Sequence, residues 1–287
     1  MIRIFRFFLL LACCASLGQG LYFFRKGFSL RRLQCLPQSC SYEPSLEIQK
    51  IIKQPFYYIG RGRQCFAFAS QDGLYVLKCP RTDIYRLPLW ARTLPVSAKR
   101  DAMIKDKTYR KNFVFNSFRI AKEILPEETG TLAIHLGESA KTDQKITLVD
   151  ALGVSFHLPL YKTIFILQHK HPLWTPLFLD AQKKGDVREQ ERLLEALIDI
   201  ISERAKKGIL NRDRSFLRNY GFDGKQAHQI DVGDFFEKTT WDRHIVFHKS
   251  VEDSLTPVKE WLEENHKEML PFFEKRFSQL FASTPSS

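Results

Sequence analysis

The apolar and polar positions change from strand-like alternation in the first half of the chain to a helical repeat in the second. The segment FYYIGRGRQCFAFAS alternates around Gly60 and Gly62, QDG is a turn signal, and LYVLK reads as a returning strand. This pattern predicts a hairpin that ends at Lys78. Further strands are predicted in TLAIHL, KITLVDAL and TIFILQ. The first half of the chain is therefore expected to be rich in strands.

Apolar residues at helical spacing dominate the rest of the chain. The clearest helix is VREQERLLEALIDIISERAKKGI, with Gly208 as its stop signal. A second helix, TYRKNFVFNSFRIAKEIL, falls between the predicted strands and is ended by Pro126. Short strands around NYGF and HQIDV flank Asp223 and Gly224, a pair typical of tight hairpins, and two polar-faced helices close the chain. The order of elements predicts an α+β fold.

The first residues, MIRIFRFFLLLACCASLGQGLYFF, have the pattern of a targeting segment. Arg3 and Arg6 precede an apolar run that small residues follow, as in a signal peptide. With the residues up to Phe24, the apolar stretch approaches the roughly 20 residues that cross a bilayer. An uncleaved N-terminal membrane anchor at 1–24 is therefore an alternative, and a buried core helix is a third. Basic residues are more numerous after the span, which favours an anchor with a cytoplasmic domain over export.

Composition and charge describe a folded, basic protein. The 287 residues are 44% hydrophobic and include 24 Phe, enough to fill a core. The formal net charge is +12, and the excess is concentrated between Cys79 and Lys122, where eleven basic residues face three Asp. A solvated basic face is one interpretation, and contact with an anionic membrane surface or a membrane-linked acceptor is another. A nucleic-acid binder is not favoured, because Tyr109, Phe113 and Phe115 are better used as helix core than for stacking on bases.

The cysteines leave the compartment open. Cys35 and Cys40, in CLPQSC, are placed to pair only if their loop lies outside the cytoplasm. Cys65 and Cys79 sit in strand-like segments, where a small buried thiol is the usual outcome. No histidine is close enough in sequence to suggest a zinc site with them.

Several polar residues stand where a phosphoryl-transfer site would need them. Such a site neutralises phosphate charge, holds a metal with carboxylate and amide oxygens, and orients the attacking hydroxyl. Gly60 and Gly62 let the backbone approach a phosphate, because glycine has no Cβ. Lys78 ends an apolar strand within reach of such phosphates, and Glu123 is a candidate to pair with its ammonium. Taken singly, each has an ordinary explanation as a turn glycine or a solvated side chain.

The second half of this pattern is more specific. Asp213 follows the long helix in the loop NRD, where a carboxylate can accept a hydroxyl proton. Asn219 lies in the same loop and offers an amide oxygen to magnesium. Asp231 leaves a strand just before a Val-Gly turn, as a metal ligand would. These residues occur in one consistent chain order, which their separate ordinary explanations do not account for.

Residues from about Phe56 to Phe235 resemble the protein-kinase-like superfamily. IGRGRQCFAFAS and YVLK are similar to its Gly-rich loop and strand-three Lys motif, LNRDRSFLRN to its catalytic loop, and IDVG to Asp-Phe-Gly. The resemblance implies a two-lobed α+β fold that binds ATP and Mg²⁺ between the lobes. Residues 25–45, which are basic and contain Pro and Ser, are expected to be a linker. The resemblance implies a strand-rich N-lobe with a basic insertion at 46–168 and a reduced helical C-lobe at 169–287.

The resemblance also implies roles for the candidate residues. Lys78 would contact the nucleotide phosphates, Glu123 would pair with it, and Asp213 would be the catalytic base. Asn219 and Asp231 would bind the metal. Because no Ala-Pro-Glu segment follows, the chain looks more like the compact kinases that phosphorylate saccharides, lipid-linked saccharides or small molecules, including the lipopolysaccharide-core kinases.

The sequence departs from the family pattern at several positions. Cys65 replaces the third glycine, Asn211 the histidine and Val232 the phenylalanine, and Asn219 lies six residues after Asp213, one more than is usual. Two hypotheses follow. One is a membrane-associated phosphotransferase that acts on a hydroxyl of a saccharide, lipid or protein. The other is a pseudokinase that serves as a membrane-anchored binding module.

Overall fold

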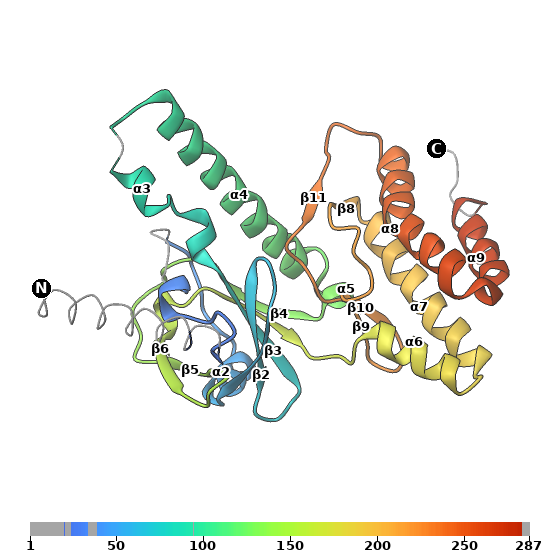
Figure 1. The fold of residues 1–287 in the computed structure, drawn as a ribbon, viewed down its shortest axis with the longest axis horizontal. Coiled ribbons are helices and arrows are strands. Elements are labelled where there is room, and N and C mark those ends of the chain that lie inside the picture. The colour runs from blue at the N-terminus through green and yellow to red at the C-terminus, as the bar shows by residue number, and fades with distance from the viewer. Residues whose placement is uncertain (1–19, 21–23, 34–38, 94, 283–287) are drawn as a thin grey trace, which may run out of the picture. The chain divides into compact units, whose positions relative to one another are not determined.

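The computed structural model describes residues 20, 24–33, 39–93 and 95–282 (Figure 1). The predicted signal peptide or anchor lies almost wholly outside these residues. Cys35 lies outside them too, so its pairing with Cys40 stays a prediction. Among the described residues, no helix is both long and apolar enough to cross a bilayer.

The described chain has a mixed α/β fold. Its helices are α2 Leu46–Lys53, α3 Leu89–Arg92, α4 Ala98–Glu123, α5 Pro126–Thr129, α6 Trp174–Lys183, α7 Val187–Lys206, α8 Arg243–Asn265 and α9 Leu270–Ala282. Its strands are β1 Phe56–Arg61, β2 Cys65–Ser70, β3 Tyr75–Pro80, β4 Thr131–His135, β5 Lys145–Val149, β6 Ser155–Pro159, β7 Phe165–His169, β8 Ile209–Asn211, β9 Tyr220–Phe222, β10 Ala227–Gln229 and β11 Phe235–Glu237. Short 3-10 turns are η1 Leu30–Arg32, η2 Thr82–Tyr85, η3 Leu160–Lys162 and η4 Lys267–Met269.

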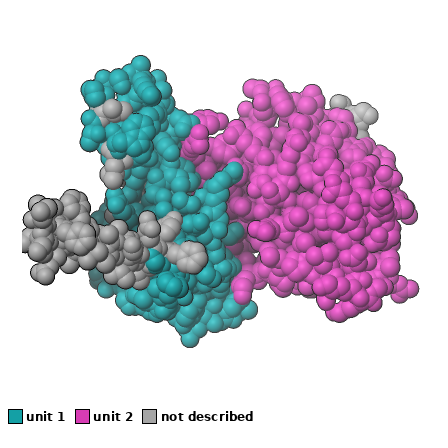
Figure 2. Space-filling model, viewed as in Figure 1, with its two compact units in different colours: residues 1–107, 135–167 teal, residues 108–134, 168–287 magenta. Residues whose placement is uncertain are grey.

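The chain divides into two compact units (Figure 2). Unit 1 comprises residues 1–107 and 135–167, and unit 2 comprises 108–134 and 168–287. Residues 108–134, which fall within the strand-rich half of the sequence, therefore belong to unit 2. The two-lobed kinase arrangement stays a prediction.

A seven-stranded sheet has the order β4-β7-β3-β2-β1-β5-β6, and β1, β2, β3, β5 and β6 lie wholly in unit 1. The predicted hairpin is confirmed as β2 and β3, which pair in antiparallel register with Ala67 opposite Lys78. On β1 the register places Gly60 opposite Ala67. Residues directly opposite one another across neighbouring strands project from the same face of a sheet. Gly60, Ala67 and Lys78 therefore form one row on one face.

The opposite face of β2 and β3 forms the core of unit 1. Phe66, Phe68 and Leu77 are fully buried there. Phe28 packs its ring edge-on against Phe66 and Phe68, with centroids 5.3 and 5.5 Å away. Residues around Phe28 were expected to be part of a linker, but this segment packs against the sheet. Arg25 of the same segment also pairs with Asp150 at 3.0 Å. The segment has no regular apolar repeat, so hydrophobic periodicity gives no sign of these contacts.

The core of unit 2 is built around α7, which confirms the helix predicted from its repeat. Its apolar face packs against α6, which the sequence pattern did not indicate, and against α8. Trp174 of α6 donates its indole N–H to the Leu193 carbonyl at 2.6 Å. The hairpin predicted at Asp223 and Gly224 is confirmed as β9 and β10, and Gly224 has φ +97°, which favours glycine.

Arg204 of α7 is a buried cation within this core, with only 1% of its surface exposed. Its guanidinium donates to the Gln229 side chain, to the Ser254 hydroxyl at 2.6 Å and to the Tyr220 hydroxyl at 3.4 Å. These acceptors come from β10, α8 and β9. Because a buried charge is costly unless it is hydrogen-bonded, Arg204 fixes the short β9–β10 hairpin against the helices.

Candidate functional site

Asp213 and Asn219 lie in one loop of unit 2, between β8 and β9. The Asp213 carboxylate accepts hydrogen bonds from the Ser215 backbone N–H at 2.8 Å and from the Asn219 side-chain amide at 3.0 Å. The Asp213 N–H donates to the Asn211 side chain at 3.1 Å. The structure thus brings Asp213 and Asn219 together despite the extra residue between them. The Asn219 amide nitrogen is used in this bond, which leaves its oxygen as a donor atom for a cation.

Two short strand pairs hold Asp231 near this loop. The Ile230 N–H donates to the Asn219 carbonyl at 2.8 Å and so extends the β9–β10 ladder. The Arg212 N–H donates to the Asp234 carbonyl at 3.0 Å and extends the β8–β11 ladder. The two segments are therefore joined at both ends. Asp231 directly follows Ile230 and is exposed, so its carboxylate is accessible to a ligand.

Ser117 of α4 ties the Asp-Val-Gly segment to the helix. Its hydroxyl donates to the Val232 carbonyl at 2.6 Å and accepts from the Phe235 N–H, also at 2.6 Å. All three residues are buried. One serine therefore satisfies two backbone groups of the segment that begins at Asp231, and no sequence motif singled it out.

Arg212, next to Asp213, is held by aromatic side chains. Its guanidinium lies 4.0 Å from the ring centroid of Phe113 and 5.1 Å from that of Phe236. It also donates to the Tyr109 hydroxyl at 3.4 Å. These cation–π contacts fix the loop backbone beside Asp213. Tyr109 is exposed and Phe113 half-buried, so these two residues contact Arg212 and do not lie in the helix core where we expected them, whereas Phe115 is buried as expected.

The candidate phosphate-binding residues lie in unit 1. The β1–β2 turn is closed by a hydrogen bond from the Gly62 N–H to the Cys65 carbonyl at 2.8 Å. No atom lies within 4 Å of the position that a Cβ on Gly60 would occupy, so the backbone there is open to a ligand. Lys78 is half-buried and shares its row on the sheet with Gly60.

The candidate residues are divided between the two units. Glu123 is the exposed last residue of α4, and no ion pair to it is found in the described part of the chain. Lys78 belongs to unit 1 and Glu123 to unit 2, so their ion pair stays a prediction. Within the described residues, no group of three or more His, Cys, Asp or Glu side chains is arranged to hold a metal. Magnesium at nucleotide sites usually takes only one or two carboxylates together with substrate phosphates, a donor set that Asp231 and Asn219 fit.

A histidine pair beside the β9–β10 hairpin was not predicted. The His171 ring stacks on the His228 ring with centroids 4.1 Å apart and planes within 7°. His228 bonds through one ring nitrogen to the Glu127 carbonyl and through the other to Asp223, each at 3.0 Å. Burial, followed by the neighbouring His228, lowers the pKa of His171 to about 4.

This low pKa predicts acid sensitivity in unit 2. The unfolded chain binds the His171 proton near pH 6.5 and the folded chain only near pH 4, so the stabilisation present above pH 6.5 is lost as the pH falls. Because the ring is only partly buried, we expect a loss of about 1 kcal/mol between pH 7.5 and pH 5. In urea titrations across this range, the free energy of unfolding should change less with pH in His171→Gln than in the unaltered protein. An identical dependence in both proteins would contradict the assignment.

No protein-family model matches the chain, and no curated protein matches it. Among solved structures, the chain is similar to WbdD, described as a bifunctional kinase-methyltransferase. The 2.2 Å structure of WbdD is 19% identical with a TM-score of 0.38, over 80% of this chain and 46% of that one. A medium-resolution structure is 20% identical with a TM-score of 0.34, over 78% and 44%. The chain spans less than half the length of these structures, and a TM-score below 0.5 is too low to assign a fold.

Proposed function

We propose that this protein is a kinase-like phosphotransferase that uses Mg-ATP to phosphorylate a hydroxyl group. The observation that carries the proposal is the hydrogen bond between Asp213 and Asn219, with Asp231 held beside their loop by two strand pairs. A base and two metal-binding oxygens are the groups that phosphoryl transfer requires on one side of the nucleotide. Unit 1 offers groups for the phosphates, because the open backbone at Gly60 and the ammonium of Lys78 share one row of the sheet.

Each residue has one role in this proposal. Asp213 accepts the proton of the acceptor hydroxyl and orients it, while Asn219 keeps the Asp213 carboxylate in place through its amide nitrogen. Asp231 and the Asn219 amide oxygen hold Mg²⁺, which supplies charge neutralisation to the phosphates when bound. Lys78 contacts the phosphates, and Glu123 pairs with Lys78 when a two-lobed kinase fold brings them together.

The acceptor is a saccharide, a lipid or a protein, and the protein acts at a membrane. The N-terminal apolar segment and the formal charge of +12 support the membrane association, because a basic surface is attracted to anionic lipids. A domain kept in the cytoplasm would also have access to ATP.

Nucleotide binding tests the proposal directly. Mg-ATP at about 100 times its Kd should stabilise the full chain by about 2.7 kcal/mol, because it binds the folded state alone. Lys78→Met and Asp231→Asn should each remove most of this stabilisation. Lys53→Met and Asp180→Asn alter exposed side chains and should not. A folded chain that gains no thermal stability from Mg-ATP would contradict the proposal.

The second candidate function is a pseudokinase that binds a partner at the membrane. The six-residue spacing between Asp213 and Asn219 and the cysteine in place of the third loop glycine favour it. A pseudokinase would keep the fold and could keep nucleotide binding. Its function would not change when Asp213 is replaced by asparagine.

A further inference from the structure

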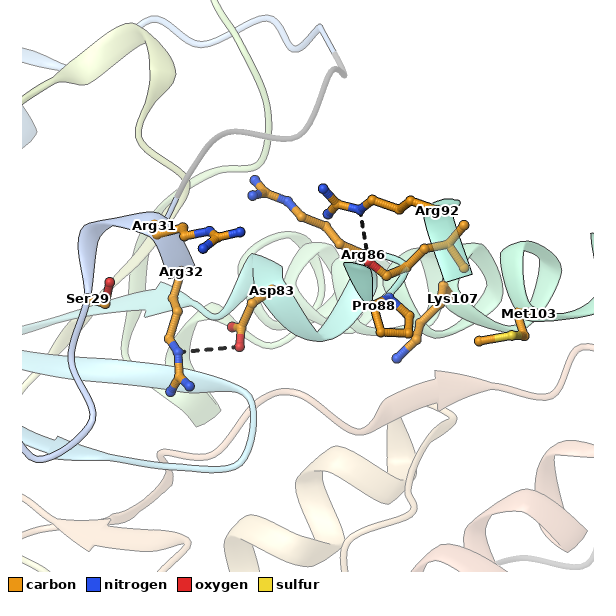
Figure 3. Close-up of a pocket in the computed structure, with 10 residues that line it drawn as sticks. Ser29, Arg31, Arg32, Asp83, Arg86, Pro88, Arg92, Met103 and Lys107 are labelled. Carbon is orange, nitrogen blue, oxygen red and sulfur yellow. Dashed lines mark hydrogen bonds and ion pairs between the residues drawn. The ribbon is translucent and has the colours of Figure 1, made fainter. Parts of the chain in front are cut away.

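Unit 1 contains a cavity of about 510 Å³, which three separate segments of the chain form (Figure 3). These segments lie outside the strands that carry Gly60 and Lys78. Its walls come from η1, from η2 and α3 with their connection, and from the first turns of α4. The lining residues are Ser29, Arg31, Arg32, Asp83, Arg86, Leu87, Pro88, Arg92, Met103 and Lys107. The cavity thus joins the basic segment after β3 to two arginines from the segment that we expected to be a linker.

The lining is strongly cationic. Five arginine or lysine side chains stand against one carboxylate, a formal excess of four positive charges. That carboxylate, Asp83, is already opposed by two guanidinium groups, Arg32 at 3.5 Å and Arg81 at 3.3 Å. In Figure 3, the side chains of Arg31, Arg86 and Arg92 extend toward the same space. Like charges that line one pocket repel one another, so their gathering favours an anion between them.

Main-chain hydrogen bonds hold two of the cations in place. Arg92 donates to the Leu87 carbonyl at 3.0 Å, and the Lys107 ammonium donates to the Ile84 carbonyl at 2.7 Å. These acceptors are neutral, so they orient the side chains without cancelling the charge. Leu87, Pro88 and Met103 add apolar surface to the same walls. A positioned set of cations beside apolar surface in a solvent-open hollow is typical of a site for an organic anion, whereas a flat basic face has no such hollow.

We infer that this cavity binds an organic ligand that carries two phosphate groups. One phosphomonoester has a charge of about −1.5 to −2 at pH 7, so two of them match the excess of four positive charges. The volume lies within the roughly 300–1,000 Å³ of small-molecule sites, which is too large for a bare ion alone. Arginine also forms paired hydrogen bonds with phosphate oxygens. The inference concerns residues of unit 1 alone and holds whether or not the protein transfers phosphate.

The ligand is either a soluble sugar phosphate or a phosphorylated lipid headgroup, which share this chemistry. Exposed apolar side chains adjoin the lining residues in sequence: Leu30 follows Ser29, Trp90 lies between Pro88 and Arg92, and Ile104 follows Met103. The experiment must therefore separate the two sources.

Calorimetric titration of the full chain with fructose 1,6-bisphosphate provides the first arm. We expect binding that the double variant Arg31→Gln/Arg92→Gln weakens at least tenfold, because each lost guanidinium removes charge-assisted hydrogen bonds. Lys50→Gln/Lys53→Gln removes the same charge from the exposed face of α2 and should change the affinity less than twofold. An excess of Mg-ATP should leave the binding intact, which separates this cavity from the proposed nucleotide site.

Vesicle co-sedimentation provides the second arm. Phosphatidylcholine vesicles that contain phosphatidylinositol 4,5-bisphosphate are compared with phosphatidylserine vesicles of the same surface charge. If the source is a lipid, the bisphosphate vesicles bind more protein, and Arg31→Gln/Arg92→Gln removes the difference. If it is soluble, only the first arm shows variant-sensitive binding. Failure of both probes to bind, equal weakening in the two double variants, or full displacement by Mg-ATP would overturn the inference.

Discussion

Replacing Asp213 by asparagine is expected to lower phosphoryl transfer by about 10²–10⁴-fold, the usual contribution of a positioned general base. The change is nearly isosteric, and the remaining amide oxygen can still accept one of the two hydrogen bonds that the carboxylate now receives from Ser215 and Asn219. The fold should therefore survive, while the group that accepts the proton is lost. Release of inorganic phosphate from Mg-ATP, with water as acceptor, measures the effect without knowledge of the natural acceptor.

A matched substitution makes this result interpretable. Asp180→Asn changes an exposed carboxylate on α6 whose only ion pair is with Lys184 in the described chain, and it should leave the rate unchanged. Mg-ATP binding should be largely retained in Asp213→Asn, since the proposed phosphate and metal contacts lie on Lys78, Asn219 and Asp231. If Asp213→Asn releases phosphate as fast as the unaltered protein, the catalytic assignment is wrong and the pseudokinase hypothesis gains support.

The elements with strong periodicity were predictable from sequence. Helix α7 has a continuous apolar stripe and a glycine stop, and the β9–β10 hairpin has an Asp-Gly turn, so local physics alone fixes both. Helix α4 was predicted from residue 108 but begins at Ala98, because its first turns are polar and carry no apolar repeat. Strand β6 and helix α6 were also missed, although α6 has Trp174, Phe178 and Ala181 at helical spacing, because both elements are short and carry only a few apolar residues each.

Residues of the candidate site were predictable only where a motif marked them. Asp213, Asn219 and Asp231 stand in the chain order that a phosphoryl-transfer site would use, although Asn219 is one residue further from Asp213 than is usual, and the structure places them in joined segments. Ser117 was not predictable, because its hydrogen-bond partners, Val232 and Phe235, lie more than a hundred residues later in the sequence and meet it only in the folded protein. The cavity in unit 1 was hidden too, since Arg31 and Arg32 meet Arg86 only after η1 packs beside η2.

Ser117→Ala is the second substitution with a large expected effect. It removes the hydrogen-bond partner of the Val232 carbonyl and of the Phe235 N–H, both of which are buried. Each unsatisfied buried group costs about 1–3 kcal/mol. We expect the free energy of unfolding to fall by about 2–4 kcal/mol in urea titrations. Because the same bonds anchor the segment that begins at Asp231, the Mg²⁺ concentration needed for half-maximal ATP binding should rise as well.

Ser202→Ala is the control for this effect. Ser202 lies in α7 of the same unit and is 2% exposed, but its hydroxyl has no hydrogen-bond partner within the described chain. The same atom is removed at similar burial, so the comparison isolates the two hydrogen bonds from the loss of a hydroxyl. Ser202→Ala should therefore be neutral or slightly stabilising. If the two variants differ in stability by less than about 0.5 kcal/mol, the size of an ordinary surface substitution, Ser117 does not anchor the Asp-Val-Gly segment.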